Sequence, residues 1–449
     1  MTHAHFIGIG GSGLSAIARL LQESGYTVTG SDRDQSPFVD DLRVIGITVH
    51  IGHEAAQIRG ADLIVRSSAI PDANPEVQAA LEAGIPVYKR SDFLGRLMEE
   101  KIGIAIAGTH GKTSTTAMMA WTLTALQQDP SFIVGGVING LNVNAHAGTG
   151  KTFVIEADEY DRMFLGLKPT IGIVTNLEHD HPDIYPTAES FRAAFVEFIR
   201  LIPENGVLIA CGDDWGAADL IKEAQQADIN TLAYSLNDVE NLQPNTTGGF
   251  DFYVQNNHVS LQVPGKHNVL NALAVLKVVE YQGLSLENAA RALGDYSGTG
   301  RRFEMIGSVN GITIYDDYAH HPTEIRATLA GARARHPRAR IWAVWQPHTY
   351  SRTQMLFDEF SQAFNDADET IVTEIYASRE AKQDFSSAEV VAAMKNPSAR
   401  FIADLNETGN YLIENLHPND VLIILSAGDA IEISKKVLKA LSEKAQVSS

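Results

Sequence analysis

The apolar positions of this chain fall into short runs that end at glycine, proline or an acidic residue, and amphipathic stretches separate the runs. Each run has the length of a buried strand, and the stretch that follows has the spacing of a helix with one apolar face. Repeated strand–helix units of this kind predict parallel sheets covered by helices. The pattern therefore predicts an α/β protein.

The runs form three groups along the chain. Strands are expected in the first group at residues 5–10, 26–32, 63–70 and 85–90, with a helix over 14–25. Strands are expected in the second group near 102–107, 152–156, 170–175 and 206–211, with helices over 115–126 and 268–280 and a hairpin over 250–263. Strands are expected in the third group near 311–317, 340–346, 369–375 and 420–426. We expect three domains, at residues 1–98, 99–296 and 297–449, with a hinge at Ser297–Gly300.

Length and composition agree with this division. A chain of 449 residues exceeds what one hydrophobic core organises, and about three domains of roughly 150 residues would account for it. With 35 basic and 55 acidic side chains the net charge is −20, which argues against nucleic acid or an anionic membrane as a partner. Any polyanionic ligand must therefore be held by local donors.

The cysteine content and the N-terminus bear on the compartment. The single cysteine, Cys211, excludes an internal disulfide and a zinc site built on several cysteines. The N-terminal segment lacks the pattern of a signal peptide, and no apolar run is long enough to span a membrane. We expect a cytoplasmic protein without membrane insertion.

A glycine motif lies between the first expected strand and helix. Gly8, Gly10 and Gly13 have the GxGxxG spacing that lets a backbone approach a diphosphate at a helix N-terminus. Asp32 ends the second strand, where an acid that binds ribose would stand. The motif is compatible with several nucleotides, and also with a tight turn that binds nothing. A nicotinamide-dependent oxidoreductase is one hypothesis that it supports.

The segment GTHGKTS, residues 108–114, resembles a phosphate-binding loop with a shortened spacing. It joins an apolar strand to a helix, so its amide groups would face an anion at the positive end of the helix. Lys112 would contact the β- and γ-phosphates, and the Thr113 hydroxyl would bind Mg²⁺. ATP and Mg²⁺ are the expected ligands. A nucleotide-controlled binding module without catalysis also fits this motif.

Acidic and imidazole side chains follow the next two strands of the second group. The segment Glu156–Asp161 contains four carboxylates, and His179, Asp180 and His181 end the following run. The carboxyl ends of parallel strands line the ligand crevice of an open sheet. A metal site beside phosphates is therefore expected at this edge, with a solvated acidic turn as the alternative.

Polar clusters also follow two strands of the third group. His320 and His321 come after Asp316 and Asp317, while His348 and Arg352 lie in the segment QPHTYSRT. A paired histidine is as often a hydrogen-bonded turn as a ligand. Two clusters on successive strand ends nevertheless indicate a binding edge.

In this order the motifs resemble the ATP-dependent Mur ligases of peptidoglycan precursor synthesis. The segments that carry the resemblance span almost the whole chain: HFIGIGGSG, SSAI, GTHGKTS, EADE, TNLEHDH, HNVLNA, GTGRRFE, DDYAHHPTE and QPHTYSRT. The resemblance implies a Rossmann-like UDP-binding domain, a central P-loop-type ATPase domain and a C-terminal Rossmann-like ligase domain. Within the family, the chain is most similar to the members that join L-alanine to the lactyl carboxylate of UDP-N-acetylmuramate.

The resemblance also implies roles for individual residues. UDP-sugar contacts are implied for Gly10, Gly11, Ser12, Gly13, Asp32, Ser67 and Ser68. ATP contacts are implied for Gly108, Thr109, His110, Gly111, Lys112, Thr113, Ser114, Asn268, Asn271 and Arg302. Metal ligands are implied at Thr113, Glu156 and His181, and a grip on the amino-acid carboxylate at His348 and Arg352. Lys112, Glu156, His181, Arg302, His348 and Arg352 form the implied catalytic set. His321 corresponds to a residue of the closed interdomain site, and a monomer or weak homodimer is expected.

Two positions depart from the pattern of the alanine-adding members. Position 160 is Tyr where these members commonly have Ser, and position 349 is Thr where an Arg usually helps to hold the amino-acid carboxylate. EADEYD is similar to the related ligases that attach recycled murein tripeptide to UDP-N-acetylmuramate. The alternative amine donor is therefore murein tripeptide, while the other segments favour L-alanine.

Overall fold

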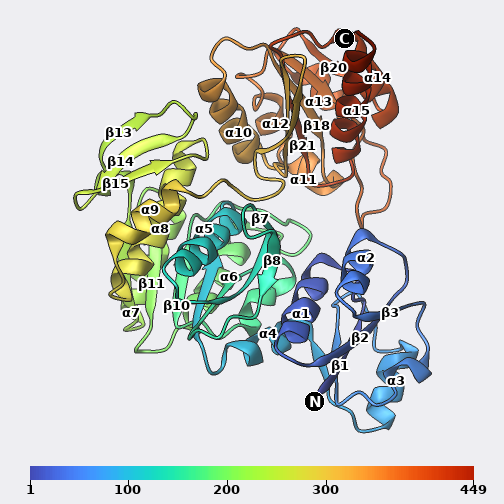
Figure 1. Ribbon diagram of the computed structural model, residues 1–449, viewed down its shortest axis with the longest axis vertical. Coiled ribbons are helices and arrows are strands. Elements are labelled where there is room, and N and C mark those ends of the chain that lie inside the picture. Colours follow the sequence, from blue (N-terminus) through green and yellow to red (C-terminus); the bar gives the residue numbers. More distant parts are fainter. Residues whose placement is uncertain (449) are drawn as a thin grey trace. The chain divides into compact units, whose positions relative to one another are not determined.

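The computed structural model describes residues 1–448. The chain divides into two compact units. The first comprises Met1–Glu178, Glu189–Ser235 and Leu273–Ala292, and the second comprises His179–Ala188, Leu236–Ala272 and the chain from Leu293 onward. Strand–helix repeats build most of both units (Figure 1), so the predicted α/β class is confirmed.

The N-terminal part of the first unit is a parallel sheet with strand order β3-β2-β1-β4-β5. Its strands are β1 (His3–Ile7), β2 (Thr27–Asp32), β3 (Thr48–Ile51), β4 (Leu63–Arg66) and β5 (Val87–Lys89). Its helices are α1 (Ser12–Glu23), α2 (Pro37–Val44), α3 (Pro75–Glu82) and α4 (Arg90–Met98), with a 3₁₀ turn η1 (Ala55–Ile58). Two of these helices begin with a cap and a proline, Ser36-Pro37 for α2 and Asn74-Pro75 for α3.

A second sheet of the first unit has strand order β12-β11-β10-β6-β9-β7-β8, in which the β7–β8 pair is antiparallel. Its strands are β6 (Ile102–Ala107), β7 (Ser131–Ile138), β8 (Val143–His146), β9 (Thr152–Glu156), β10 (Ile171–Val174), β11 (Val207–Cys211) and β12 (Asn230–Tyr234). The helical segments between them are α5 (Lys112–Ala125), η2 (Tyr160–Gly166), α6 (Ala188–Ile199) and α7 (Trp215–Gln226). β6 lies at the centre, with β9 and β10 on its two sides.

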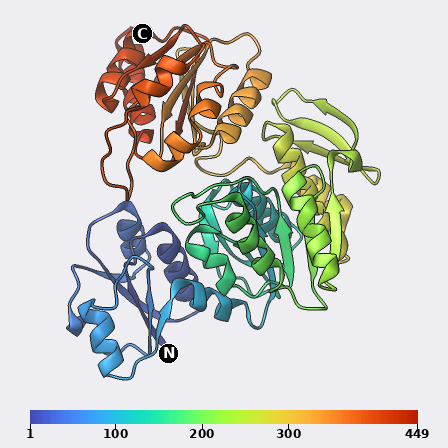
Figure 2. The ribbon, with the colours of Figure 1, turned by 180° about the vertical axis from the view of Figure 1, so that it is seen from behind.

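Helices cover both faces of this second sheet. The chain moves one way along the sheet through α5, from β6 to β7, and the other way through α6, from β10 to β11. Right-handed crossovers in opposite directions place their helices on opposite faces. Figure 1 accordingly shows α5 in front of the sheet, and Figure 2 shows α6 in front when the molecule is turned. The central strands are buried on both sides, which explains their unbroken apolar sequences.

The second unit contains an antiparallel sheet, β13-β14-β15, and a larger sheet with order β16-β17-β21-β18-β19-β20. The strands are β13 (Glu240–Pro244), β14 (Phe250–Val254), β15 (Asn257–Leu261), β16 (Glu304–Val309), β17 (Ile312–Asp317), β18 (Ile341–Gln346), β19 (Glu369–Val372), β20 (Ala399–Phe401) and β21 (Val421–Ser426). The helices are α10 (Pro322–Arg335), α11 (Tyr350–Met355), α12 (Phe357–Ser361), α13 (Ser387–Ala393), α14 (Leu405–Asn415) and α15 (Ile431–Ser448), with a 3₁₀ turn η3 (Leu236–Asp238). Helices α8 (Lys266–Tyr281) and α9 (Leu286–Gly294) contain the points where the two units divide.

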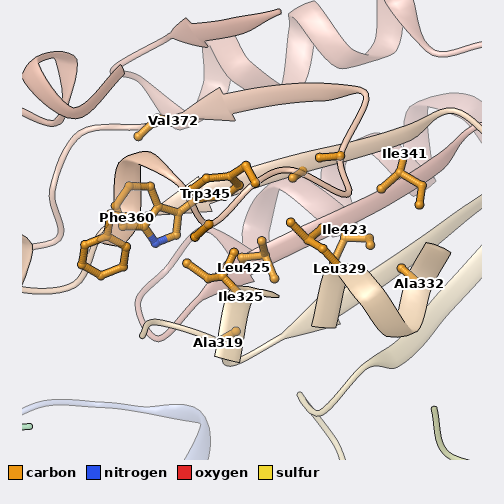
Figure 3. Close-up of a cluster of buried hydrophobic side chains, with 14 of the residues drawn as sticks. Ala319, Ile325, Leu329, Ala332, Ile341, Trp345, Phe360, Val372, Ile423 and Leu425 are labelled. Atoms are coloured by element: carbon orange, nitrogen blue, oxygen red, sulfur yellow. The ribbon is translucent and has the colours of Figure 1, made fainter. Parts of the chain in front are cut away.

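The larger sheet of the second unit has apolar side chains on both faces. On one face Trp345 stacks on Phe360 with ring centroids 4.4 Å apart, and Ile325 and Leu329 of α10 pack beside them (Figure 3). The opposite face packs Trp342 and Ile424 against α14 and α15. The two clusters hold β17, β18 and β21 rigidly, so the loops at the carboxyl ends of these strands have fixed starting points.

Most predicted elements are present with shifted ends. The first strand begins at His3 and ends at Ile7, and the first helix runs from Ser12 to Glu23. The predicted hairpin is β14 and β15, but a third strand, β13, pairs with it. Within the described residues, no helix has both the length and the apolarity to cross a membrane.

Candidate functional site

The loop between β6 and α5 is a tight turn that depends on two glycines. Gly108 has φ +136° and Gly111 has φ +80°, and both values favour glycine. A Cβ on Gly108 would lie 2.0 Å from Thr175 Oγ1, so no side chain fits there. Thr109 Oγ1 donates to the Glu178 carbonyl over 2.7 Å and fixes the loop to the segment after β10. The loop with the shortened spacing therefore has one fixed backbone conformation.

Lys112 begins α5 and folds back over this loop. Its Nζ donates to the carbonyl oxygens of Gly108, at 2.6 Å, and Thr109, at 3.1 Å, and lies 2.9 Å from Glu159 Oε2. Burial lowers the pKa of Lys112, but Glu159 and Asp158 outweigh it and hold that pKa above its ordinary value. The lysine is charged at neutral pH, and a carboxylate of the same unit neutralises it.

Thr113 and Glu156 are brought together from neighbouring elements. Thr113 Oγ1 donates to Glu156 Oε2 over 3.2 Å, and the amide of Gly135 donates to the other oxygen of the same carboxylate. A hydroxyl beside a carboxylate, at the end of a strand next to a phosphate-type loop, is a donor set that Mg²⁺ prefers. These two residues fit the predicted ion.

The neighbouring carboxylate of Asp158 also favours a cation. Burial, together with the charge of Glu159, raises the pKa of Asp158 above its ordinary value. Crowded carboxylates of this kind repel one another, and added positive charge relieves the repulsion. The acidic cluster after β9 is thus a candidate cation site rather than a solvated turn.

The first glycine loop is braced by Asp32. The Gly10 amide donates to Asp32 Oδ2 over 2.7 Å, and Gly8 has φ +81°. Ser67 lies beside the loop, since its Cβ is 3.1 Å from the position that a Cβ on Gly8 would take. The N-cap of α1 is Gly11, which provides no side-chain cap. The start of α1 therefore presents backbone amides, as a diphosphate site requires.

A buried ion pair in the second unit holds Arg352. Its Nε donates to Asp180 Oδ1 over 2.9 Å and its Nη2 to Asp180 Oδ2 over 3.2 Å, while Nη1 lies 3.1 Å from His348 Nδ1. Nη2 is also 3.5 Å from His181 Nδ1. Burial raises the pKa of Asp180, but Arg352 and His181 outweigh it and hold that pKa well below its usual range. His181, His348 and Arg352 thus meet around Asp180.

Two histidines near Arg352, His348 and His320, are neutral at neutral pH. Burial, with help from Arg352, lowers the pKa of His348 to about 4 and that of His320 to about 3. A neutral imidazole can accept a hydrogen bond from the guanidinium, which fits the His348 contact. Thr349 is buried, with φ +67°, and donates its amide to the Tyr376 carbonyl. Its backbone therefore shapes the turn before α11.

The predicted nucleotide contact Arg302 lies in a turn fixed by Asp317. Oδ2 of Asp317 accepts from the Phe303 amide over 2.7 Å, and burial raises the pKa of Asp317 to about 6. Arg301 and Arg302 both lie over the Tyr318 ring, at 4.9 and 5.1 Å from its centroid. The turn thus holds two guanidinium groups against one aromatic ring.

The other predicted adenine contacts stand on α8. Asn271 Nδ2 donates to Asn268 Oδ1 over 3.0 Å, and Asn268 Nδ2 donates to the Pro264 carbonyl over 2.7 Å. The two amides form a short chain at the start of the helix. His321 is buried and caps α10, accepting from the Thr323 amide.

The predicted residues therefore gather in each unit separately. Lys112, Thr113 and Glu156 meet in the first unit, and His181, His348 and Arg352 meet in the second. The sequence predicted that Glu159 and Asp180 belong to the acidic and imidazole clusters, but it did not predict their ion pairs with Lys112 and Arg352. It did not single out Arg90, whose side chain packs on Gly13.

Comparisons with known proteins match most of the chain, in three segments. Residues 3–102 match the description "Mur ligase family, catalytic domain", residues 106–279 match "Mur ligase middle domain", and residues 301–428 match "Mur ligase, glutamate ligase domain". These matches fit the predicted three-domain α/β architecture.

Individual relatives are similar over almost their full lengths. A UDP-N-acetylmuramate–L-alanine ligase of Clostridium beijerinckii is 41% identical, covering 97% of this chain and 97% of that protein. The crystal structure of UDP-N-acetylmuramate–alanine ligase MurC from Thermotoga maritima has a TM-score of 0.82 at 28% identity, covering 99% of this chain and 100% of that one. A murein peptide ligase from Psychrobacter arcticus has a TM-score of 0.71 at 28% identity, covering 98% of this chain and 99% of that one. This chain belongs to the Mur ligase family.

Proposed function

We propose that this protein joins L-alanine to the lactyl carboxylate of UDP-N-acetylmuramate and hydrolyses ATP to ADP and phosphate in doing so. The observation that carries the proposal is the compact loop with Lys112, beside the Thr113–Glu156 pair, in a chain 41% identical to a ligase named for this reaction. ATP is the phosphoryl donor, as in an acid–amino-acid ligase of the Mur family. The product is a precursor of peptidoglycan.

The carboxylate needs activation because it and the amine of L-alanine form a salt, not an amide, at neutral pH. A lactyl carboxylate oxygen attacks the γ-phosphorus of ATP, the bond from that phosphorus to the bridging oxygen breaks, and ADP and an acyl phosphate are formed. The deprotonated amine then attacks the acyl carbon, and the C–O bond to phosphate breaks as the C–N bond forms. The protein has to position these groups and balance phosphoryl charge.

Lys112 supplies charge to the phosphates. Its ammonium is paired with Glu159 before nucleotide binds, and phosphate oxygens replace that carboxylate when ATP enters the loop. Gly108, Thr109, His110, Gly111 and Ser114 form the rest of the ATP site. The amides of Thr109 and His110 donate to Asn176, so the amides from Gly111 onward would face the phosphates. Thr113 would hold one Mg²⁺, and the family pattern implies Glu156 and His181 as ligands of a second; these ions would neutralise charge on the phosphate oxygens.

The remaining residues keep the roles that the family pattern implies. Asn268 and Asn271 bind adenine, and Arg302 contacts the ATP phosphates. Gly10, Gly11, Ser12, Gly13, Asp32, Ser67 and Ser68 hold the UDP-sugar. His348 and Arg352 bind the carboxylate of the amino acid. Because Arg352 already has a bidentate partner in Asp180, its share of that binding comes through Nη1, on the side of His348.

Exclusion of water completes the mechanism, since an acyl phosphate hydrolyses. We place the domains at residues 1–98, 99–296 and 297–449, and closure of the third domain about Ser297–Gly300 would seal the site. The cytoplasm is the proposed location. A monomer or weak homodimer suffices for this chemistry. Equal scattering dimensions for the free protein and its complex with nucleotide and UDP-sugar would contradict closure.

A second candidate donor is murein tripeptide. Tyr160 is the observation that favours it, and the murein peptide ligase fold is shared at a TM-score of 0.71. The greater similarity to the alanine-adding relatives favours L-alanine.

The test offers each amine separately. Purified protein with ATP, Mg²⁺ and UDP-N-acetylmuramate receives L-alanine, glycine, L-serine or murein tripeptide, and phosphate release and product mass are measured. We expect a product heavier by one alanyl residue and the fastest phosphate release with L-alanine. Turnover with tripeptide alone would establish the second candidate. ATP binding without amine-dependent ADP release would instead indicate a binding module, and reduction of a nicotinamide cofactor would indicate an oxidoreductase.

A further inference from the structure

Arg90 lies against the first glycine loop. It is the first residue of α4, and its guanidinium packs on the backbone of Gly13, near the start of α1. A Cβ on Gly13 would come within 2.2 Å of Arg90 Cζ and 2.5 Å of both Nη atoms. Gly13 is therefore needed for this contact as well as for the approach of a ligand. The guanidinium covers the place where the loop passes into the helix.

The charge of Arg90 is not matched by a contact with an acid. Its Nε is buried and has no hydrogen-bond partner within residues 1–448. Burial lowers the pKa of Arg90, while the charges of Asp158 and Glu156 act in the opposite direction. These two carboxylates attract the guanidinium, but neither accepts a hydrogen bond from its Nε. A half-buried guanidinium whose buried Nε has no acceptor is costly, so an anionic ligand at this place would be favoured.

The start of α1 favours the same kind of ligand. Its N-cap, Gly11, offers no side-chain oxygen, and the amides of the first turn point out of the helix. Their partial positive charge would repel the guanidinium unless an anion lay between them. A diphosphate provides oxygens for both partners, and an arginine fork matches two of these oxygens at once.

We propose that Arg90 binds the diphosphate of the uridine nucleotide together with the amides at the start of α1. This inference rests on the proposed function, which makes UDP-N-acetylmuramate the ligand of that loop. Arg90 contacts the loop at Gly13, and the charges of the carboxylates Glu156 and Asp158 also act on it. Its positive charge would thereby offset the repulsion between the diphosphate and the acidic cluster. The residue links the nucleotide-sugar loop to the proposed metal site.

Calorimetry on the full chain tests the role without ATP or Mg²⁺. UDP-N-acetylmuramate, UDP and uridine are titrated into wild type, Arg90→Met and Arg90→Lys, with uridine measured by competition. We expect Arg90→Met to bind UDP about 10- to 100-fold more weakly and uridine within about twofold of wild type, because only UDP offers charged acceptors. Arg90→Lys keeps the charge but loses the two parallel N–H donors of the guanidinium, so its loss of UDP affinity should lie between those of wild type and Arg90→Met.

Arg96→Met is the matched control. Arg96 is on the same helix, and its Nη1 donates to the Tyr88 hydroxyl. It should leave UDP and uridine affinities unchanged. Unchanged UDP affinity in Arg90→Met, or an equal loss for UDP and uridine, overturns the inference. If Arg90→Met does not fold, Arg90→Lys decides by the same comparison. Failure of wild type to bind UDP-N-acetylmuramate or UDP would instead refute the proposed function.

Discussion

Two basic side chains of the first unit, Lys112 and Arg90, are held in opposite ways beside the two glycine loops. Lys112 has a carboxylate 2.9 Å away and two carbonyl oxygens within 3.1 Å. Arg90 has a buried Nε that no atom of the described chain accepts from, and only distant attraction from Asp158 and Glu156. One loop is therefore neutralised before its ligand arrives, and the other is not.

The difference concerns the order of events. A lysine with an internal counter-ion must exchange Glu159 for phosphate, so part of the attraction of ATP is offset by the lost ion pair. An arginine without such a partner loses nothing when a diphosphate binds. We infer that the nucleotide-sugar loop is ready for its ligand, whereas the ATP loop rearranges on binding.

Loss of the Lys112 charge should have the largest effect. Lys112→Ala should lower the rate of ADP formation by roughly 10³-fold or more, about 4 kcal/mol, because the developing phosphoryl charge loses its nearest cation. UDP-N-acetylmuramate affinity should stay within about twofold of wild type, since that ligand uses the other loop. Phosphate release and calorimetry measure the two quantities.

Lys222→Ala is the control, because Lys222 is largely exposed and has only a loose pair with Asp219. Full activity of Lys112→Ala would refute its phosphate role. An equal loss of ADP formation in both variants would point to a general defect and not to the loop.

Removal of the acid beside Arg352 comes next in size. Asp180→Asn should lower the free energy of unfolding by about 3 kcal/mol, since it leaves a buried guanidinium without a charged partner. Denaturant unfolding of the free protein measures this.

The control for that experiment lies in the same segment. Asp183 pairs with Arg379 at 3.1 Å, but both side chains are partly exposed, so Asp183→Asn should cost less than about 1 kcal/mol. Equal losses for the two variants would show that the burial of the Arg352 pair has no energetic consequence.

The sequence predicted the central strands of the large sheets because these strands are buried on both faces. Strands such as β6 and β21 consist of unbroken apolar residues, and such runs are visible without a structure. Edge strands were missed, among them β3, β8, β12, β13, β16 and β20. The residues of β13, ENLQP, show the reason, because they carry no apolar alternation and pair only with a neighbouring hairpin. The ligand loops were also visible, since glycines at fixed spacings have a local steric cause.

Partners of the site residues could not be predicted in the same way. Arg352 and Asp180 are separated by 172 positions, and the packing of Arg90 on Gly13 joins the ends of two different strand–helix units. No local pattern encodes which charges meet across such distances. A basic residue at the start of a helix, where the dipole disfavours it, was the available signal for Arg90.

The proposed replacement of Glu159 by phosphate at Lys112 can be tested by a substitution with a smaller expected effect on stability. Glu159→Gln should lower the free energy of unfolding by about 2 kcal/mol, less than Asp180→Asn, because the two carbonyl bonds of Lys112 remain. Mg²⁺ and ATP should then raise the melting temperature of Glu159→Gln more than that of wild type, since phosphate no longer displaces a carboxylate. Glu99→Gln, at an exposed pair with Lys168, serves as control. Equal shifts in the variant and wild type would argue against exchange.

A buried carboxylate in the N-terminal sheet shows that this region can satisfy a charge internally. Glu76 is buried and lies 2.7 Å from His5 Nε2 and 2.9 Å from His53 Nδ1, and it accepts from Ser31 Oγ over 2.9 Å. Burial raises the pKa of Glu76, but the hydrogen bonds from His5, Ser31 and His53 outweigh it and hold that pKa below its ordinary value. The lack of a hydrogen-bond acceptor at Arg90 Nε is therefore a property of that position and not of the whole N-terminal sheet.

Substitution of Glu76 should give the smallest and the most pH-dependent change. Because the folded-state pKa is below the unfolded one, the network stabilises above about pH 4.3 and the stabilisation is lost as pH falls through the folded pKa. Glu76→Gln should thus be about 1–2 kcal/mol less stable than wild type at pH 7, with the gap narrowing below about pH 4. Urea unfolding across this range, with exposed Glu82→Gln on the same helix as control, measures it. A gap that stays constant with pH would assign the loss to packing, and the contrast between Glu76 and Arg90 would then not be one of charge.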